Sequence, residues 1–146
     1  MNSKDLQHRT KKFALDIIKL TEHLPNNRVG WTFTDQIVRS STSVAANYRA
    51  VCRARSDKEF ISKIGIVIEE ADETLFWLEM IYDSGIMNDD LGFRNDDLST
   101  IQNQKSAIIN LKIEANELVS IFVASAKTVK ARLNQQSKIN NQKSVQ

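Results

Sequence analysis

The segment SDKEFISKIGIVIEEADETLFWLEMIYDSG, residues 56–85, has the pattern of one long amphipathic helix with a defined start and end. Ser56 and Glu59 have the spacing of a capping box at the start, and Gly85 is a typical C-terminal stop. Small and apolar residues recur between them with the helical period, at Phe60, Ile64, Val67, Ala71, Thr74, Leu78 and Ile81. A second stripe lies beside the first, at Ile61, Ile68, Leu75 and Tyr82. Together the stripes form the wide apolar face of a helix in a bundle.

The segment before it, RSSTSVAANYRAVCRARS at residues 39–56, is rich in alanine and in small hydroxyl residues. We expect a helix that begins near Thr32, because Thr32 and Asp35 have capping-box spacing, with an aspartate in place of the usual Glu or Gln. Its predicted inward stripe consists of Phe33, Ile37, Ser41, Val44, Tyr48 and Val51. Small residues fill a core poorly, but they allow a neighbouring backbone to come close. We therefore interpret this segment as a helix packed tightly against its neighbour.

An earlier helix is predicted from Lys4 to His23, with Ser3 as its N-cap. Its apolar face recurs at helical spacing, at Phe13, Ile17, Leu20 and Leu24. The sequence Pro25-Asn26-Asn27 then ends the helix.

A fourth helix is predicted after a loop at residues 86–95. It begins near Asn95 or Asp96, where an acid suits the positive end of a helix, and it continues with heptad spacing to about Asn134. The remaining residues, 135–146, are polar with only two apolar side chains, so we expect a disordered tail.

The composition favours an all-α fold, because four glycines and one proline in 146 residues leave few turns for a sheet protein. An antiparallel, up-down-up-down four-helix bundle over residues 1–134 is the simplest packing of four such helices. No apolar run is long enough to cross a membrane, and the charged segment MNSKDLQHRTKKFALD lacks the apolar region of a signal peptide. We therefore expect a cytoplasmic protein. The single cysteine, Cys52, excludes an internal disulfide.

The sequence does not favour a catalytic or metal site. Di-iron bundles use Glu-x-x-His pairs, but the two histidines, His8 and His23, belong to no such motif. The carboxylates between Glu69 and Glu79 are instead expected to be solvated or paired with arginines of the preceding helix. There is no glycine-rich phosphate loop, and no strained glycine-flanked turn surrounds the serines at 40–43. We therefore expect a non-enzymatic protein without a cofactor or metal ion.

Charge is strongly segregated along the chain although the formal net charge is only +2. Residues 28–58 carry six basic residues and two acids, residues 59–98 carry two and eleven, and residues 118–146 carry five basic residues and no acid. Such asymmetry is typical of contact between elements or subunits, or of contact with phosphate.

Two groups of basic residues are candidates for nucleic-acid binding. The first consists of Arg39, Arg49, Arg53 and Arg55. The first three of these lie within about 80° of one another around an ideal helix. Arginine binds both phosphate and carboxylate well, so contact with nucleic acid and ion pairing with residues 69–79 both remain open. The second group consists of Lys127, Lys130 and Arg132. Its alternative role is solubility, together with favourable charge at a helix C-terminus.

Four apolar residues fall outside the two stripes of the 56–85 helix, namely Ile66, Phe76, Trp77 and Met80. A monomeric bundle would expose much of this cluster, and exposed apolar clusters mark interfaces. We expect them at a subunit contact, with partial burial within one chain as the alternative.

Residues 36–79, QIVRSSTSVAANYRAVCRARSDKEFISKIGIVIEEADETLFWLE, contain the most specific motifs of the chain. The pattern Gln-Ile-x-Arg-Ser-Ser-x-Ser-x-x-Ala-Asn, followed by Arg-x-Arg-Ser-x-x-Glu-Phe, resembles the signature of the four-helix-bundle proteins encoded in 23S rRNA intervening sequences. The resemblance covers about residues 5–134. It departs from many members after Asn47, where Tyr48-Arg49-Ala50-Val51 replaces a segment similar to Ile-Ala-Glu-Gly. Any role of that glutamate does not carry over.

The resemblance implies a four-helix bundle assembled into a ring, a homopentamer, without known enzymatic activity. A similar bundle occurs in the accessory variability determinant of diversity-generating retroelements, a pentameric barrel that binds nucleic acid. We therefore expect a ring that binds RNA or DNA with low sequence specificity and has no membrane partner. The alternative is a scaffold that binds another protein and has no nucleic-acid role, because fold alone does not determine function.

Overall fold

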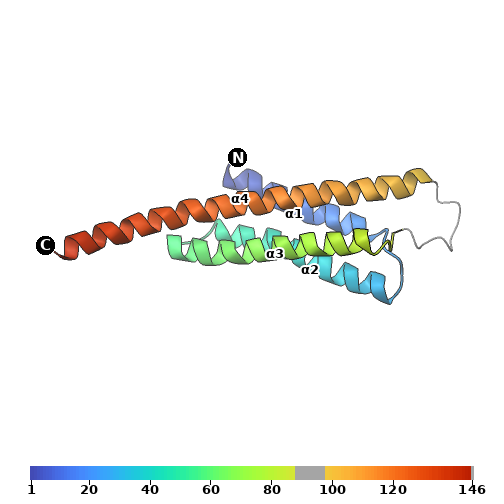
Figure 1. The fold of residues 1–146 in the computed structure, drawn as a ribbon, viewed down its shortest axis with the longest axis horizontal. Helices are drawn as coiled ribbons and strands as arrows, with labels where there is room; N and C mark the ends of the chain where they lie inside the picture. The colour runs from blue at the N-terminus through green and yellow to red at the C-terminus, as the bar shows by residue number, and fades with distance from the viewer. Residues whose placement is uncertain (88–97, 146) are drawn as a thin grey trace.

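The computed structural model describes residues 1–87 and 98–145, and all regular structure in these ranges is helical. The chain forms four helices in order, α1 (Ser3–Thr21), α2 (Arg28–Val51), α3 (Asp57–Asp83) and α4 (Leu98–Ser144) (Figure 1). The prediction of an all-α fold with four helices is confirmed. The expected start of the fourth helix at Asn95 or Asp96, and most of the expected loop at 86–95, lie outside the described residues.

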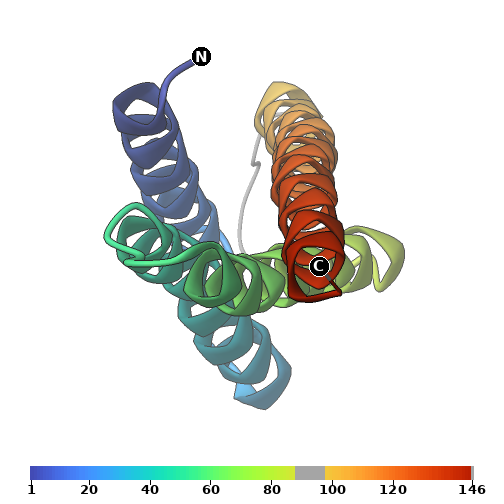
Figure 2. The same cartoon turned by 90° about the vertical axis from the view of Figure 1, so that its left-hand side faces the viewer.

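Each helix packs against its neighbours around a common apolar core. The helix α2 contacts α1 and α3, and α4 contacts α3 closely and α1 more slightly. The end-on view shows the corresponding separation between α1 and α4 (Figure 2). The largest fully buried side chains come from all four helices and include Phe13, Ile17, Ile37, Val44, Ile64, Leu78, Leu118 and Phe122. None of the helices, over the described ranges, has an apolar stretch of the length that a membrane span requires.

The helix starts differ in how well the sequence predicts them. At α3 the Ser56 hydroxyl accepts a hydrogen bond from the Glu59 N–H at 3.1 Å, as expected of an N-cap. At α1 the cap is Asn2, one residue before the expected Ser3, and its side chain forms a reciprocal capping box with Asp5. Asn and Ser are about equally good N-cap residues, so the residue types alone do not decide between Asn2 and Ser3.

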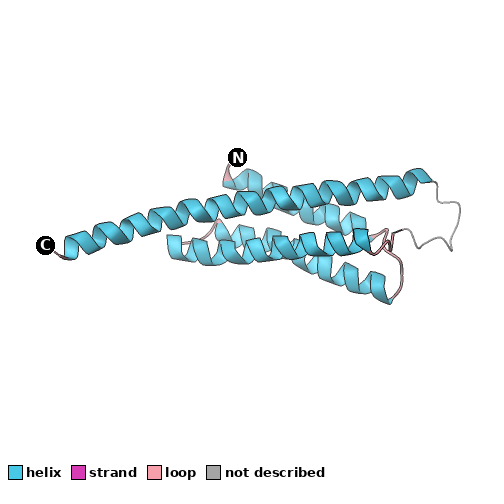
Figure 3. Ribbon diagram, in the orientation of Figure 1, coloured by secondary structure: helices cyan, strands magenta, loops and turns pink. Residues whose placement is uncertain are grey.

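The start of α2 differs more from the prediction than the start of α1 does. The helix begins at Arg28, four residues before the expected Thr32, because the Asn27 side chain accepts a hydrogen bond from the Gly30 N–H at 2.9 Å. The Thr32 hydroxyl donates to the Arg28 carbonyl at 3.0 Å within the first turns. The loop between α1 and α2 is consequently short (Figure 3).

At Ser40 the helix α2 lies close against α3. Ser40 and Ser41 are fully buried, and so is Thr74 on α3. The Thr74 hydroxyl lies 2.9 Å from Ser40 Oγ and 2.8 Å from the Glu70 carbonyl oxygen. The hydroxyls therefore satisfy one another where larger side chains would hold the helices apart.

The helix α4 continues through Ser144, so the expected end near Asn134 and the disordered tail are wrong for residues 135–144. This segment contains no glycine or proline, and its Gln and Lys residues are good helix formers. Extending an existing helix requires no new nucleation. The last turns consequently project beyond the start of α3 (Figure 1).

Candidate nucleic-acid interface

The end of α2, the start of α3 and the C-terminal part of α4 meet at one end of the bundle. The rings of Tyr48 on α2 and Phe122 on α4 pack with their centroids 5.5 Å apart. Further along α4, the Arg132 guanidinium binds both carboxylate oxygens of Asp57, at 3.1 and 2.9 Å. These contacts place Arg49, Arg53 and Arg55 at the same end of the bundle as the second basic group. We call residues 49–63 and 127–143 the basic end.

The basic end has few acids, and both are already paired. Each of its two segments carries five basic residues, and the only acids are Asp57 and Glu59. Asp57 pairs with Arg132, and Glu59 pairs with Lys63 at 2.7 Å. The remaining predicted residues are exposed and form no ion pair within the described part of the chain, namely Arg49, Arg53, Arg55, Lys127 and Lys130. Their positive charge therefore faces solvent.

Arg132 binds Asp57 and is also partly exposed to solvent. Its hydrogen bonds hold the pKa of the Asp57 carboxyl below its ordinary value. The side chain of Arg132 is nevertheless 62% exposed, so one face of the guanidinium stays open to solvent. This residue ties α4 to the first turn of α3.

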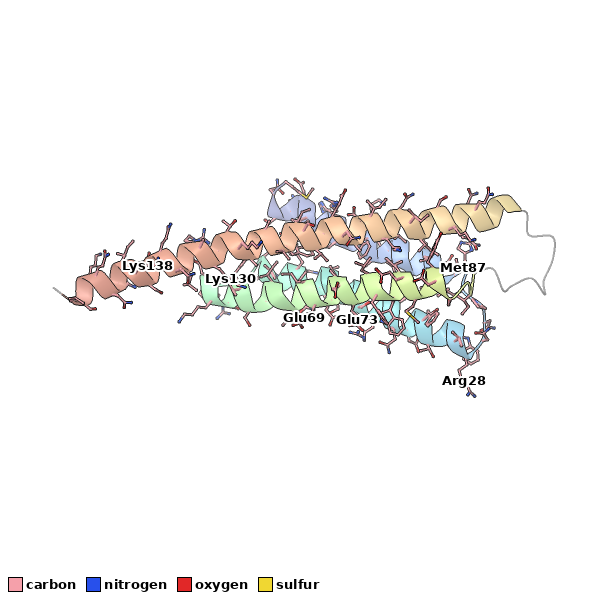
Figure 4. The ribbon with its side chains drawn as sticks, viewed as in Figure 1. Arg28, Glu69, Glu73, Met87, Lys130 and Lys138 are labelled. Carbon is pink, nitrogen blue, oxygen red and sulfur yellow. The ribbon has the colours of Figure 1, made fainter. Side chains whose placement is uncertain are left out.

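Arg39 is separate from the basic end, because it packs against acids in the middle of α3. Its guanidinium binds Glu70 at 3.2 Å and also pairs with Glu73. These hydrogen bonds lower the pKa of the Glu73 carboxyl. Glu73 and Glu69 lie along the same side of α3 (Figure 4). For Arg39, the alternative of ion pairing with α3 is therefore the one observed.

The four predicted interface residues divide into an exposed set and one half-buried residue. Ile66, Phe76 and Met80 are 43%, 49% and 38% exposed. Trp77 packs within the chain instead, with its ring centroid 5.8 Å from that of Phe33 and 5.0 Å from that of Phe76. The structure thus leaves Ile66, Phe76 and Met80 as an exposed apolar surface on α3, and Trp77 packs against Phe76 in this surface.

A hollow of about 790 Å³ lies between α1 and α4, with Phe13, Leu20 and Leu111 among its lining residues. At its edge Arg9 binds Glu114 through two hydrogen bonds, of 2.5 and 2.9 Å, and a further one to Glu117. Sequence patterns did not identify this cluster, because its partners lie more than 100 positions apart.

The described ranges contain no candidate metal centre. No three His, Cys, Asp or Glu side chains there are grouped so that they could hold a metal ion. The lone Cys52 is exposed at the C-cap of α2. In the sequence it lies between Val51 and Arg53.

Comparison with known proteins gives one family and a related structure. The family described as 23S rRNA-intervening sequence protein matches residues 3–107. No curated protein matches the chain. A similar solved structure is a protein of unknown function from the S23 ribosomal protein family of Bacteroides thetaiotaomicron VPI-5482, 25% identical, with a TM-score of 0.64. The alignment covers 83% of this chain and 97% of that chain.

Proposed function

This chain belongs to the 23S rRNA-intervening sequence protein family, and from this premise we propose a non-enzymatic, ring-forming protein that binds RNA or DNA through its basic end. The observation that carries the proposal is the convergence of three helix ends whose only two acids are already paired with cations. Uncompensated positive charge of this kind attracts the phosphate backbone.

The contacts would be made mainly by the exposed cations Arg49, Arg53, Arg55, Lys127 and Lys130. Contacts to phosphate carry no sequence information, so this surface alone would bind with low specificity and strong salt dependence. Arg132 would contribute its open face. Arg39 is omitted, because Glu70 and Glu73 already hold its guanidinium.

Assembly is the second part of the proposal. We infer an up-down-up-down bundle that forms a homopentameric ring. The bundle is supported by the course of the chain in Figure 1, where each helix returns along the one before it. The ring is supported by the exposed apolar side chains of Ile66, Phe76 and Met80, which a subunit contact would cover. A ring would also repeat the basic end on every subunit and so raise affinity through multivalency.

The test is nucleic-acid binding by a charge-reversed variant, Arg49→Glu with Arg53→Glu. Fluorescence anisotropy is measured with labelled RNA and DNA at several salt concentrations. The matched control is Lys11→Glu with Lys19→Glu, since both lysines are exposed on α1 and form no ion pair in the described structure. We expect at least tenfold weaker binding and a shallower salt dependence for the arginine variant only. Equal effects of the two pairs would contradict the assignment.

A protein-binding scaffold is the second candidate. It is favoured by the exposed acids that flank the apolar surface of α3, namely Glu69, Asp72, Glu79 and Asp83. This function predicts negligible binding of RNA and DNA at physiological salt. It also predicts that one defined partner protein is retained on wild-type protein and lost after Phe76→Ser.

A further inference from the structure

Within the residues that the structure describes, the last three turns of α4 have no neighbouring helix. Arg132 is level with Asp57, the first residue of α3, so α4 extends beyond the start of α3 from Leu133 to Ser144. This projection adds about 18 Å of helix at about 1.5 Å per residue. Every side chain from Asn134 onward is exposed as far as residue 145. Lys138 lies on this projection, and Lys130 lies beside the bundle (Figure 4).

The projecting helix differs in composition from the rest of the molecule. It carries two lysines, Lys138 and Lys143, and no acid. Six amides surround them, at Asn134, Gln135, Gln136, Asn140, Asn141 and Gln142. Its apolar residues are Leu133, at its base, and Ile139, and these two lie on different faces of the helix. The projection therefore has no apolar stripe for packing against another helix. Its surface is suited to a polar and negatively charged partner.

Amide side chains donate and accept hydrogen bonds together, which is the pattern offered by base edges. Asn and Gln form paired hydrogen bonds with adenine in the major groove, and Lys binds guanine or phosphate. A major groove of B-form DNA is about 12 Å wide and admits one α-helix. The major groove of A-form RNA is too deep and narrow for side chains to reach the base edges.

The basic end also lacks the surface that single strands require. Single-stranded nucleic acid binds by stacking its bases on exposed aromatic rings. Phe60 within the basic end is half-buried, and Tyr48 and Phe122 beside it are buried. Among the described residues, the exposed aromatic side chains belong to other parts of the bundle, at Trp31, Phe76 and Tyr82. A duplex is therefore the better fit.

We propose that residues 133–144 of α4 are a reading helix that enters the major groove of duplex DNA. Lys138 and Lys143 contact phosphate, and the amides contact base edges. The remaining cations of the basic end supply the affinity that is independent of sequence. This inference rests on the proposed nucleic-acid binding, and it adds the form of the nucleic acid, the element that reads it and a sequence preference.

The experiment compares duplex DNA, duplex RNA and single-stranded DNA of equal length, using full-length protein. The test variant is Lys138→Gln with Lys143→Gln, and the matched control is Lys11→Gln with Lys19→Gln, which has the same net charge. We expect the test variant to bind duplex DNA at least fivefold more weakly. The slope of log affinity against log salt should fall by about 2, because two phosphate contacts are lost. The control should change affinity less than twofold.

A second variant replaces the six amides with alanine, which keeps the charge and favours the helix. Circular dichroism verifies that helix content is retained. We expect this variant to keep the salt slope and to lose discrimination among duplex DNAs of different sequence. Retained discrimination would overturn the reading role of the amides.

The outcomes separate this inference from the function on which it rests. If wild-type protein binds no nucleic acid, the proposed function itself fails. If it binds and the lysine variant behaves as the control does, only the reading helix is overturned. Equal affinity for duplex RNA or for single-stranded DNA would overturn the assignment to the DNA major groove.

Discussion

At the scale of single residues, the contact between α2 and α3 depends on small side chains. Ser40 is fully buried against Thr74, and their hydroxyl oxygens are 2.9 Å apart. A larger residue at either position would force the helices apart, because protein interiors are close-packed.

Ser40→Leu should therefore destabilise the bundle by about 1–3 kcal/mol through overpacking. Urea unfolding followed by circular dichroism measures the change. The matched control is Thr42→Leu, because Thr42 lies on the same helix and is exposed. Equal midpoints for the two variants would show that the close approach of the helices is unnecessary.

The ion pair of Arg39 and Glu73 predicts a pH effect. The folded-state pKa of Glu73 is lowered from 4.5 by its hydrogen bond to Arg39. Its contribution to stability is therefore present above the ordinary pKa and lost as pH falls through the folded pKa. Glu73→Gln should cost up to about 1 kcal/mol at pH 7, as expected of a partly exposed pair, and less at pH 3.

Urea unfolding at the two pH values checks this expectation. Glu69→Gln is the control, since Glu69 is exposed on the same helix and forms no ion pair in the described ranges. A Glu73→Gln penalty that is equal at pH 7 and pH 3 would show that the carboxylate charge does not stabilise the fold.

At the scale of elements, the entry into α2 depends on close backbone contact. The Asn27 cap places Gly30 directly against the carbonyl group of Pro25. A Cβ atom at position 30 would lie 1.9 Å from the Pro25 oxygen, which is backbone and cannot rotate away. By contrast, a Cβ atom at Gly65, within α3, would have no atom within 4 Å.

The two glycines therefore predict opposite effects of alanine. Gly65→Ala should stabilise the protein by about 0.5–1 kcal/mol, because alanine is the better helix former. Gly30→Ala should destabilise it by about 1–3 kcal/mol through the forced backbone shift. Thermal unfolding of both variants measures the difference, and a stabilised Gly30→Ala variant would show that the α1–α2 loop can move.

At the scale of the whole molecule, the exposed apolar surface of α3 predicts self-association. Light scattering should give a mass near five times the chain mass of 16.6 kDa, at both low and high salt. Phe76→Ser with Met80→Ser should lower that mass, because the apolar contact area is lost. Leu15→Ser is the control, since Leu15 is equally exposed on α1. A monomeric wild-type protein at both salt concentrations would contradict the ring.

Much of the fold could be predicted because helical periodicity is local. The inward stripe of α3 is recovered from Ile64 to Ile81, and so are the Ser56 cap and the stop at Gly85, which has a positive φ of 68°. The exposure of Arg49, Ile66, Phe76 and Met80 could also be predicted, because these residues lie off the inward stripes of their helices. These features depend on residues three or four apart in one helix.

Sequence alone therefore determined the four helices, the faces that they bury and the segregation of charge along the chain. Only the tertiary structure decided which cations are held by acids. It paired Arg39 with Glu73 and Arg9 with Glu114, and it left Trp77 half-buried. It also placed the end of α2 beside α4, where Tyr48 packs against Phe122. The physical reason is that partners on different helices depend on how the helices are aligned against one another, and the periodicity of a single helix does not specify that alignment.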